Sequence, residues 1–434
     1  MDSINARHAT YGRRVTRGIC QVIATIPAFT VAVGVTPAFA GSSGTALHAF
    51  TGGTAGDTPQ FGTLVQDKAG ALYGTTTGDN STKNAAAGTV YQLTPAKGKK
   101  WKFTSIYKFP VTRGTYAGRP VGGLAIDASG NLYGATSFGL IFELSPPGAG
   151  SSKWTYQTIA NLENDGITLI GSLLLSSSGT LFGVSSTSTE YQNGSIFQLV
   201  PPSGGQGTWT YQTLYGFQGG SDGAVPLAGV IADAKGNLYG TTSEGGTPNK
   251  GTVFELSPPG GGQTTWNESV IYTFQSGTGD GTQPLGSLLL GESGALFGTT
   301  PFGGSSNNGT VFELVPPGAG QTVWSETIIH SFTGLGFSGP YGGVISGENG
   351  DLYGSTSTGA VGTGGTVFRL TPPAAGKKKW QIKTLWGFPT QASGTFPEGN
   401  LLLSNGNLYG TTETGGLQVC KGATYCGTVF EVTP

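Results

Sequence analysis

Acidic residues beside glycine are the side chains of this chain that are best suited to chemistry. Four aspartates occur in the contexts GDT, NDG, SDG and GDG, and two glutamates follow Thr-rich segments. Such carboxylates could coordinate Ca²⁺ or hydrogen-bond the hydroxyls of a sugar. Turn formation is the competing interpretation, because an aspartate beside glycine caps a tight turn through its own backbone. The candidate ligand-binding residues are Asp57, Arg119, Asp165, Asp222, Glu244, Asp280 and Glu413.

Catalysis by a histidine base finds little support in the sequence. His8 lies in the N-terminal leader, and His48 and His330 occupy a repeat position that is otherwise filled by tyrosine or tryptophan. Without a free imidazole, a Ser-His-Asp triad lacks its general base, and zinc, copper and haem sites lose their usual ligand. Hydrolysis by paired carboxylates stays open, with Glu244 and Glu413 as the two acids. No catalytic residue and no cofactor is therefore assigned, with Ca²⁺ as the one ion that the loop carboxylates could hold.

The first forty residues have the pattern of a secretory signal. Four arginines precede an apolar run over residues 19–35, and Ala38-Phe39-Ala40 forms an A-x-A cleavage site. The run is too short and too interrupted by proline to span a membrane. The pair Arg13-Arg14 leaves both the general secretory and the twin-arginine route open. We expect a signal peptide over 1–40 and a monomeric mature domain over 41–434, periplasmic or extracellular, with no membrane span after cleavage.

Two cysteines remain after the leader. Cys420 and Cys426 lie close together in a Gly-containing loop. In an oxidising compartment, an even pair at short spacing favours a local disulfide. Closing so short a loop stabilises by roughly 2 kcal/mol in the chain-entropy model.

The composition excludes several classes of protein. Charged residues make up 10% of the 434 residues, against roughly 25% in an average soluble protein, and the formal net charge is -1. Neither sign of charge dominates, so we expect no nucleic-acid partner. Glycine is abundant, with 78 residues, but aromatic residues at 10% supply enough apolar surface for a folded core.

A repeat organises the mature chain. The triplet Leu-[Tyr/Phe]-Gly occurs seven times, roughly 50 to 60 residues apart. Each unit contains four strand signals, which in the fifth unit are residues 286–290, 295–300, 309–316 and 324–332. Gly240, after Tyr239, is expected to let neighbouring backbones approach closely. No stretch shows a helical period, so the chain is predicted to be all-β, a seven-bladed β-propeller with four-stranded blades.

The two ends of the chain are expected to share a blade. The last unit has only three strands, and residues 45–50 match the end of a fourth strand. An N-terminal strand that completes the last blade would close the ring and leave no open sheet edge. A second grouping, in which no blade is shared, stays open. Six tryptophans recur in the fourth strands, where framework packing is favoured over sugar stacking: Trp101, Trp154, Trp209, Trp266, Trp324 and Trp380.

The repeat resembles that of the GloVer tandem-repeat extracellular proteins of bacteria. Their unit contains GNLYGTT, a Gly-rich loop and GTVF-x-L-TP, which are matched here over 236–242 with 251–258 and over 406–412 with 427–434. Departures are Phe182 and Phe297 in place of tyrosine, and Val184-Ser185 in place of Thr-Thr. The resemblance implies export and a propeller-like repeat, and it implies no activity.

Two functions remain open. In an up-and-down blade, the connections between the second and third strands share one face with the crossovers between blades. These connections are the long and variable ones, so we expect ligands on this side, here named the variable-loop face. The first function is a secreted binding or structural propeller that engages an envelope or extracellular glycan, or a protein partner. The alternative is a carbohydrate-active enzyme, a glycoside hydrolase or polysaccharide lyase, with carboxylates at the axial mouth.

Overall fold

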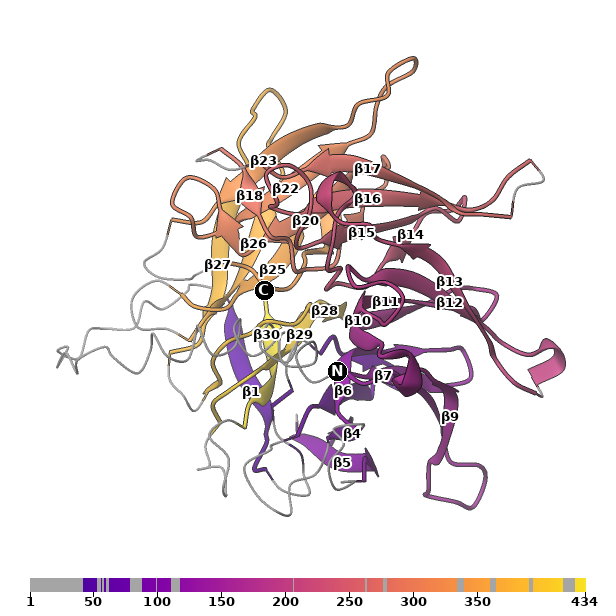
Figure 1. Ribbon diagram of the computed structural model, residues 1–434. Helices are drawn as coiled ribbons and strands as arrows, with labels where there is room; N and C mark the ends of the chain where they lie inside the picture. Colours follow the sequence, from indigo (N-terminus) through magenta and orange to yellow (C-terminus); the bar gives the residue numbers. More distant parts are fainter. Residues whose placement is uncertain are drawn as a thin grey trace, which may run out of the picture. The chain divides into compact units, whose positions relative to one another are not determined.

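The computed structural model describes residues 42–434, except for 53–55, 57, 60–61, 79–87, 99, 111–117, 206, 262–263, 276–278, 334–338, 360–363, 390–392 and 417–425. Within this part of the chain, seven four-stranded antiparallel sheets follow one another around a ring (Figure 1). The helical segments among these residues are 3₁₀ turns, and none of them is long and apolar enough to cross a membrane. The prediction of an all-β, seven-bladed propeller is confirmed.

The first three blades each use four consecutive strands. Blade 1 contains β2 (Val65–Gln66), β3 (Leu72–Thr76), β4 (Thr89–Ala96) and β5 (Lys100–Lys108). Blade 2 contains β6 (Pro120–Ile126), β7 (Leu132–Thr136), β8 (Leu140–Ser145) and β9 (Thr155–Asn161). Blade 3 contains β10 (Thr168–Leu175), β11 (Leu181–Thr187), β12 (Ser195–Val200) and β13 (Thr210–Gly216).

The next three blades repeat this order. Blade 4 contains β14 (Ile231–Ala232), β15 (Leu238–Thr242), β16 (Thr252–Ser257) and β17 (Asn267–Thr273). Blade 5 contains β19 (Leu289–Leu290), β20 (Leu296–Thr300), β22 (Thr310–Val315) and β23 (Ser325–Ser331). Blade 6 contains β24 (Ile345–Ser346), β25 (Leu352–Thr356), β26 (Thr366–Thr371) and β27 (Gln381–Gly387). A separate ribbon joins β18 (Gly281–Thr282) to β21 (Phe302–Gly303).

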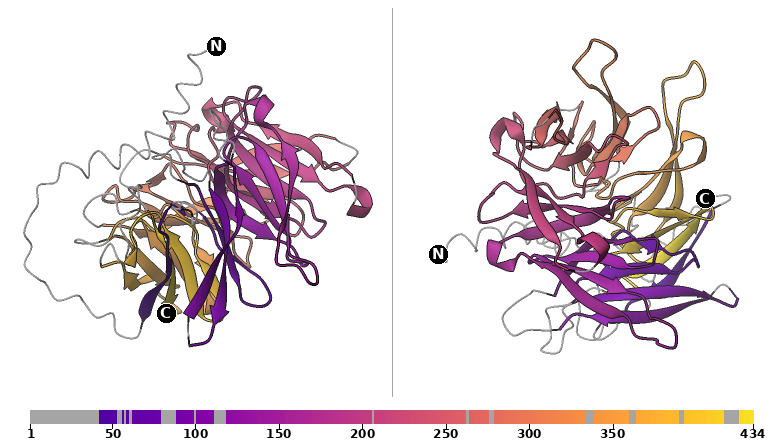
Figure 2. Two further views of the ribbon diagram at one scale, coloured as in Figure 1. Left: turned by 90° about the horizontal axis from the view of Figure 1, so that it is seen from below. Right: turned by 90° about the vertical axis from the view of Figure 1, so that its right-hand side faces the viewer.

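Blade 7 combines strands from both ends of the chain. It contains β28 (Leu402–Ser404), β29 (Asn407–Thr412) and β30 (Thr428–Thr433), with β1 (Ser43–Ala49) antiparallel to β30 (Figure 2). The register of β1 shifts between Ala46 and His48, at the place where the fourth strand of every other blade has its bulge. The N-terminal strand thus occupies the position of a fourth strand. Its contribution to closing the ring stays a prediction.

Blades 7 and 1 also contact each other directly. A Cβ on Gly399 would lie 2.8 Å from the carbonyl oxygen of Gly62, so the two inner strands pack backbone against backbone. The Thr411 hydroxyl donates to the same carbonyl at 3.3 Å. The rings of Trp101 and Tyr409 meet edge to face at 6.0 Å. This seam therefore uses the same kinds of contact as the other blade interfaces.

The glycine of the Leu-[Tyr/Phe]-Gly triplet makes room for a ring. Gly240 lies opposite Phe254 on the adjacent strand, and a Cβ on Gly240 would come within 2.5 Å of the Phe254 Cζ atom. Phe254 is completely buried, so its ring cannot swing into solvent. The expected close approach of neighbouring backbones is therefore not the main reason for this glycine. An aromatic side chain of the same blade fills the space instead.

The second Thr of the motif forms a hydroxyl pair across two strands. Thr242 and Thr252 approach within 2.8 Å between their Oγ1 atoms, where β15 ends and β16 begins, and both residues are buried. Ser185, where the motif departs from Thr-Thr, keeps the pair through Ser195 at 2.8 Å. Equivalent pairs are Thr76–Thr89, Thr300–Thr310, Thr356–Thr366 and Thr412–Thr428. This position therefore requires a hydroxyl group, and the motif has a structural role within the blade.

Tryptophans of the fourth strands connect neighbouring blades. Each packs edge to face against the aromatic residue of the triplet in the preceding blade. The pairs are Tyr73–Trp154, Tyr133–Trp209, Phe182–Trp266, Tyr239–Trp324, Phe297–Trp380 and Tyr409–Trp101. Such pairs stabilise by roughly 0.5–1.5 kcal/mol beyond their buried area. The framework interpretation of these tryptophans agrees with these contacts.

Candidate functional site

The predicted site residues lie on several different blades. Asp57 and Cys420 are outside the described residues, so the site role of Asp57 and the disulfide between Cys420 and Cys426 stay predictions. Arg119 immediately precedes β6, Asp165 ends a 3₁₀ turn after β9, and Glu244 follows β15. These three residues belong to blades 2 to 4 and their surrounding crossovers.

Asp222 and Asp280 hold the crossovers that follow their blades. Asp222 accepts hydrogen bonds from the Tyr215 hydroxyl at 2.7 Å and from the Gln218 backbone N–H at 2.5 Å. Asp280 accepts from the Tyr272 hydroxyl at 3.0 Å and from a backbone N–H at 2.6 Å. These contacts are the turn chemistry that the sequence offered as the competing interpretation.

Glu413 departs from the repeat. Five of the other six blades place a small hydroxyl residue here, and blade 5 places Pro301. In blade 4 the Ser243 hydroxyl donates to the carbonyl of Val225, in the incoming crossover, at 3.0 Å. Glu413 keeps the backbone part of this arrangement, because its N–H donates to the carbonyl of Phe396 at 2.9 Å. Its carboxyl group therefore lies where most other blades carry only a hydroxyl. Burial raises the pKa of Glu413 to about 7.

Two further departures lie beside it. In the segment that leads into the first strand, blades 2, 4 and 5 carry an aliphatic residue directly after a proline, whereas blade 1 carries Gln60, blade 6 carries Tyr341 and blade 7 carries Glu398. Tyr341 is 3% exposed and Glu398 is 6% exposed. The Tyr341 hydroxyl is buried and has no hydrogen-bond partner. Neither residue was among the predicted ligand-binding residues, although both differ from the aliphatic residue at this position in blades 2, 4 and 5.

The pKa of Tyr341 indicates that these three residues lie near one another. Burial raises the pKa of Tyr341, and the negative charges of Glu398 and Glu413 raise it further. Both carboxyl groups therefore act on the same phenol. Tyr341, Glu398 and Glu413 form what we call the axial cluster. They come from two crossovers and from the connection between β29 and β30, so the axial cluster belongs to the variable-loop face.

The axial cluster offers two acidic groups and one phenol for hydrogen bonding. Carboxylates accept from sugar hydroxyls, and a neutral tyrosine both donates and accepts. Within the described part of the chain, no three His, Cys, Asp or Glu side chains gather as a metal-ligand set. The two described histidines lie elsewhere, in outer strands. His48 stacks on Phe103 at 4.0 Å, and burial lowers its pKa to about 4.

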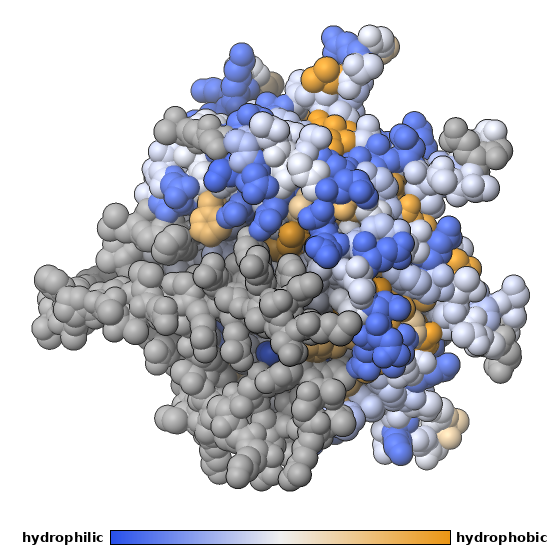
Figure 3. All heavy atoms as spheres, in the orientation of Figure 1, coloured by the Kyte–Doolittle hydropathy of each residue, from blue (hydrophilic) through white to orange (hydrophobic). Residues whose placement is uncertain are grey.

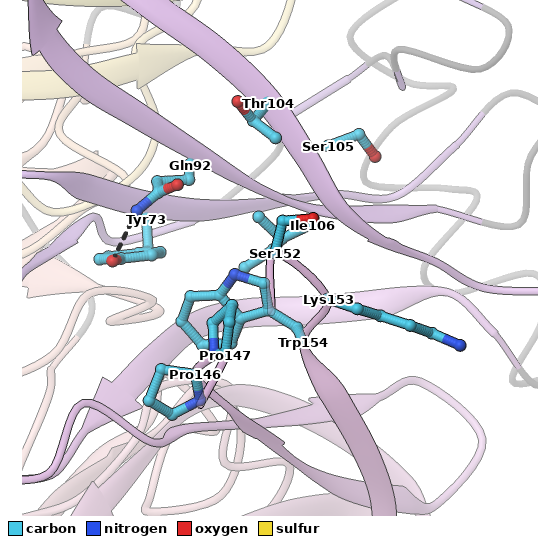
Figure 4. A pocket seen from close by; sticks show the side chains of 10 residues that line it. All are labelled: Tyr73, Gln92, Thr104, Ser105, Ile106, Pro146, Pro147, Ser152, Lys153 and Trp154. Carbon is cyan, nitrogen blue, oxygen red and sulfur yellow. Dashed lines mark hydrogen bonds between the residues drawn. The ribbon is translucent and has the colours of Figure 1, made fainter. Parts of the chain in front are cut away.

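A separate pocket lies between blades 1 and 2. It has a volume of about 470 Å³ and is lined by β3 to β5 and by the connection between β8 and β9. Figure 4 shows the Trp154 indole beside Tyr73, with Lys153 extending away from it. Tyr73 is fixed, because its hydroxyl donates to Asp67 and accepts from Gln92, both at 2.8 Å. The pocket lies on the side of the third-to-fourth strand connections, which is not the face predicted for ligands.

The pocket lies beside an aromatic contact that belongs to the framework of the fold. The Tyr73–Trp154 pair at its base recurs at five other blade interfaces. On the face shown in Figure 3, hydrophilic and hydrophobic residues of the described part are interspersed, without a broad hydrophobic area. The axial cluster, which breaks the repeat, is therefore the stronger candidate site.

Comparison with known proteins supports the repeat and the fold. Residues 138–326 match the family model of the Gloeobacter/Verrucomicrobia repeat, which confirms the resemblance over these residues. A comparison with curated protein sequences found no match.

Two solved structures are similar in fold. One is the extracellular domain of a protein of B. thetaiotaomicron described as a hybrid two-component system, with 12% identity, a TM-score of 0.53, and 89% of this chain and 39% of that chain covered. The other is PorZ, a surface component of the type-IX secretion system of Porphyromonas gingivalis, with 14% identity, a TM-score of 0.52, and 89% and 48% covered. The chain thus spans less than half the length of either protein. At such identities the likeness is one of fold alone.

Proposed function

We propose that the protein is an exported β-propeller that binds a polysaccharide of the cell envelope or the extracellular space through its variable-loop face. The leader over residues 1–40, with its arginines, apolar run and A-x-A site, supports export. The rigid ring of sheets supports a binding role, because loops of variable length on such a scaffold form adaptable recognition surfaces.

One observation carries the proposal. Tyr341 and Glu398 occupy a position that is aliphatic in blades 2, 4 and 5, and Glu413 occupies one that carries a small hydroxyl residue in most other blades. Burying the Tyr341 hydroxyl without a hydrogen bond costs free energy that a bound ligand could recover. A sugar offers several hydroxyls at spacings that carboxylates and a phenol can bind together. The axial cluster is therefore assigned to polysaccharide recognition.

The proposal is tested by binding to a panel of neutral and acidic polysaccharides. Glu413→Ser restores the hydroxyl that Ser243 and Ser357 supply in blades 4 and 6. Because a hydrogen bond to a charged group contributes roughly 1.5–3 kcal/mol, the variant is expected to bind about 10- to 100-fold more weakly. Glu244→Gln, on the same face but outside the axial cluster, is the matched control and is expected to bind as the parent does.

The result is interpreted together with the thermal stability of each variant. Weaker binding by Glu413→Ser, at unchanged unfolding temperature, supports the proposal. Equal binding by Glu413→Ser and the parent protein, or an equal loss in Glu244→Gln, contradicts it. So does the absence of binding to every polysaccharide in the panel.

A carbohydrate-active enzyme is the second candidate. The raised pKa of Glu413, about 7, favours it, because a carboxyl group that is half protonated at neutral pH can act as a general acid. Release of reducing ends or unsaturated sugars by the purified protein, lost in Glu413→Gln, would establish this function. Binding without any released product would support the binding role instead.

A further inference from the structure

Basic residues gather in the outer two strands of blades 6 and 1. The hairpin of the third and fourth strands spans residues 366–387 in blade 6 and residues 89–108 in blade 1. Every charged residue of these two hairpins is a lysine or an arginine. The described ones are Arg369, Lys377, Lys378, Lys379, Lys383, Lys97, Lys100, Lys102 and Lys108. All of these lysines are exposed, and we call the two hairpins the basic rim.

The corresponding hairpins of blades 4 and 5 carry the opposite charge. Blade 4 has Glu255 and Glu268 there, and it has no lysine or arginine. Blade 5 has Glu313 and Glu326, again without a lysine or arginine. The formal net charge of -1 for the whole chain therefore hides a separation of charge around the ring. A surface with one sign of charge attracts partners of the opposite sign.

The two basic hairpins lie on either side of blade 7. Strand β1, the fourth strand of blade 7, contacts β27 of blade 6 and β5 of blade 1 (Figure 1). Residues 43–49 of β1 include no lysine, arginine, aspartate or glutamate. An extended partner that passes over β1 therefore meets basic residues on both sides of it and no acidic residue on β1 itself.

Two basic residues face each other within blade 6. Arg369 of β26 lies directly opposite Lys383 of β27 on one side and Tyr353 of β25 on the other. Like charges directly opposite each other oppose strand pairing. The Arg369 guanidinium has one described acidic neighbour, Asp351, at 3.7 Å. No described acidic side chain forms an ion pair with Lys383, so the pair keeps a positive charge.

The repeat does not require two cations at these positions. In blade 1 the same positions hold Gln92 and Thr104, and no other blade has a lysine or arginine at either of them. Gln92 and Thr104 line the pocket of about 470 Å³ between blades 1 and 2. Side chains at these positions therefore reach a space between blades. Arg369 and Lys383 lie where a group from outside the blade can approach them.

The neighbouring blade 7 lacks the usual tryptophan beside this pair. Tyr353 packs with residues of blade 7, so the row of Tyr353, Arg369 and Lys383 faces that blade. Ser42 stands immediately before the fourth strand, where blade 2 has a tryptophan, and its hydroxyl donates to the Leu385 carbonyl at 2.6 Å. Lys383 is exposed and the Arg369 side chain is 34% exposed. Both cations are thus accessible in the folded protein.

We propose that the basic rim binds an acidic polysaccharide, with Arg369 and Lys383 as its central anion-binding pair. Guanidinium and ammonium groups bind carboxylate groups through charge-assisted hydrogen bonds. The lysines on both sides of blade 7 attract a polymer whose negative charge repeats along its length. Because Arg369 is partly buried, a slender polymer reaches it more easily than the flat surface of a membrane. This site lies apart from the axial cluster and shares with it only the class of ligand.

The test measures binding of the purified protein to polygalacturonate, with dextran as the uncharged comparison. Binding to polygalacturonate is expected to weaken as sodium chloride is added, because salt screens exposed charges. Lys383→Thr and Arg369→Gln introduce the residues that blade 1 carries at these positions. Each variant is expected to bind polygalacturonate about 10-fold more weakly at unchanged unfolding temperature. Lys235→Ser, which removes one exposed lysine from blade 4, is the matched control and is expected to change binding by less than about 2-fold.

The outcomes separate this site from the axial cluster. Weaker binding by Lys383→Thr and Arg369→Gln, but not by Lys235→Ser, supports the basic rim. No binding of polygalacturonate by the parent, or equal binding by the parent and Lys383→Thr, overturns it. Tighter binding to phosphatidylglycerol vesicles than to polygalacturonate also overturns it, in favour of a lipid surface. Equal binding by Glu413→Ser and the parent contradicts the proposed function only and leaves the result for Lys383 unaffected.

Discussion

Gly240→Ala tests whether the glycine of the repeated triplet is required for packing within the blade. The new methyl group would lie 2.5 Å from Cζ and 2.9 Å from Cε1 of Phe254, well inside van der Waals contact. Phe254 is fully buried, so the ring or the backbone must shift. Overpacking of this kind costs roughly 1–3 kcal/mol, and the lower entropy of the unfolded alanine chain offsets roughly 0.4–1 kcal/mol. The expected loss in the free energy of unfolding is about 1–2 kcal/mol.

The assay is urea denaturation of four variants and the parent. Gly260→Ala is the matched control, because Gly260 lies in an exposed connection of the same blade and a Cβ there would contact nothing within 4 Å. It is expected to change stability by no more than about 0.5 kcal/mol. Phe254→Leu shortens the obstructing ring, so the double variant with Gly240→Ala should lose at least about 1 kcal/mol less than the sum of the single losses. Equal stability of the Gly240→Ala and Gly260→Ala proteins would refute the packing argument.

Two further predictions concern buried polar groups. Thr242→Val removes the 2.8 Å contacts of its hydroxyl with the Thr252 hydroxyl and the Glu244 carbonyl, so we expect a loss of about 1–3 kcal/mol in urea denaturation. Thr242→Ser keeps the hydroxyl and should lose less; equal losses in the two variants would contradict this. Burial and the charge of Asp222 raise the pKa of Glu268 from 4.5 to about 8, so the folded protein binds more protons than the unfolded chain between these values. Stability should therefore fall as the pH rises from about 4.5 to about 8, by roughly 1–2 kcal/mol after allowance for partial exposure. Glu268→Gln should remove this dependence of stability on pH. An unchanged dependence in the variant would contradict a raised pKa of Glu268.

The fold was largely predictable because the repeat carries its own register. The Leu-[Tyr/Phe]-Gly triplet recurs at matching positions in seven units, and period-two alternation with frequent turns leaves little room for another architecture. The reason for Gly240 was not predictable, since only the paired strands reveal that Phe254 lies opposite it. The sequence pattern thus predicts the strands of a blade, but not which side chains lie opposite one another on paired strands.

The site was predictable only in part. The variable-loop face and Glu413 follow from the order of strands and loops, whereas Tyr341 lies in the preceding blade, 72 positions earlier in the numbering. Its proximity to Glu413 depends on how neighbouring blades pack. Contacts between repeats, unlike contacts within one, leave no fixed spacing in the sequence.

Hydrogen exchange of the N-terminal strand tests the central claim most directly. The claim is that residues 43–49 form the fourth strand of blade 7 through their pairing with β30. Mass spectrometry of exchange in the folded protein should show the backbone amides of Ser43–Ala49 protected to the same degree as those of β5, the fourth strand of blade 1. Exchange of residues 43–49 at the rate of an unstructured segment, with β30 protected only on its β29 side, would contradict a ring whose last blade is completed by the beginning of the chain.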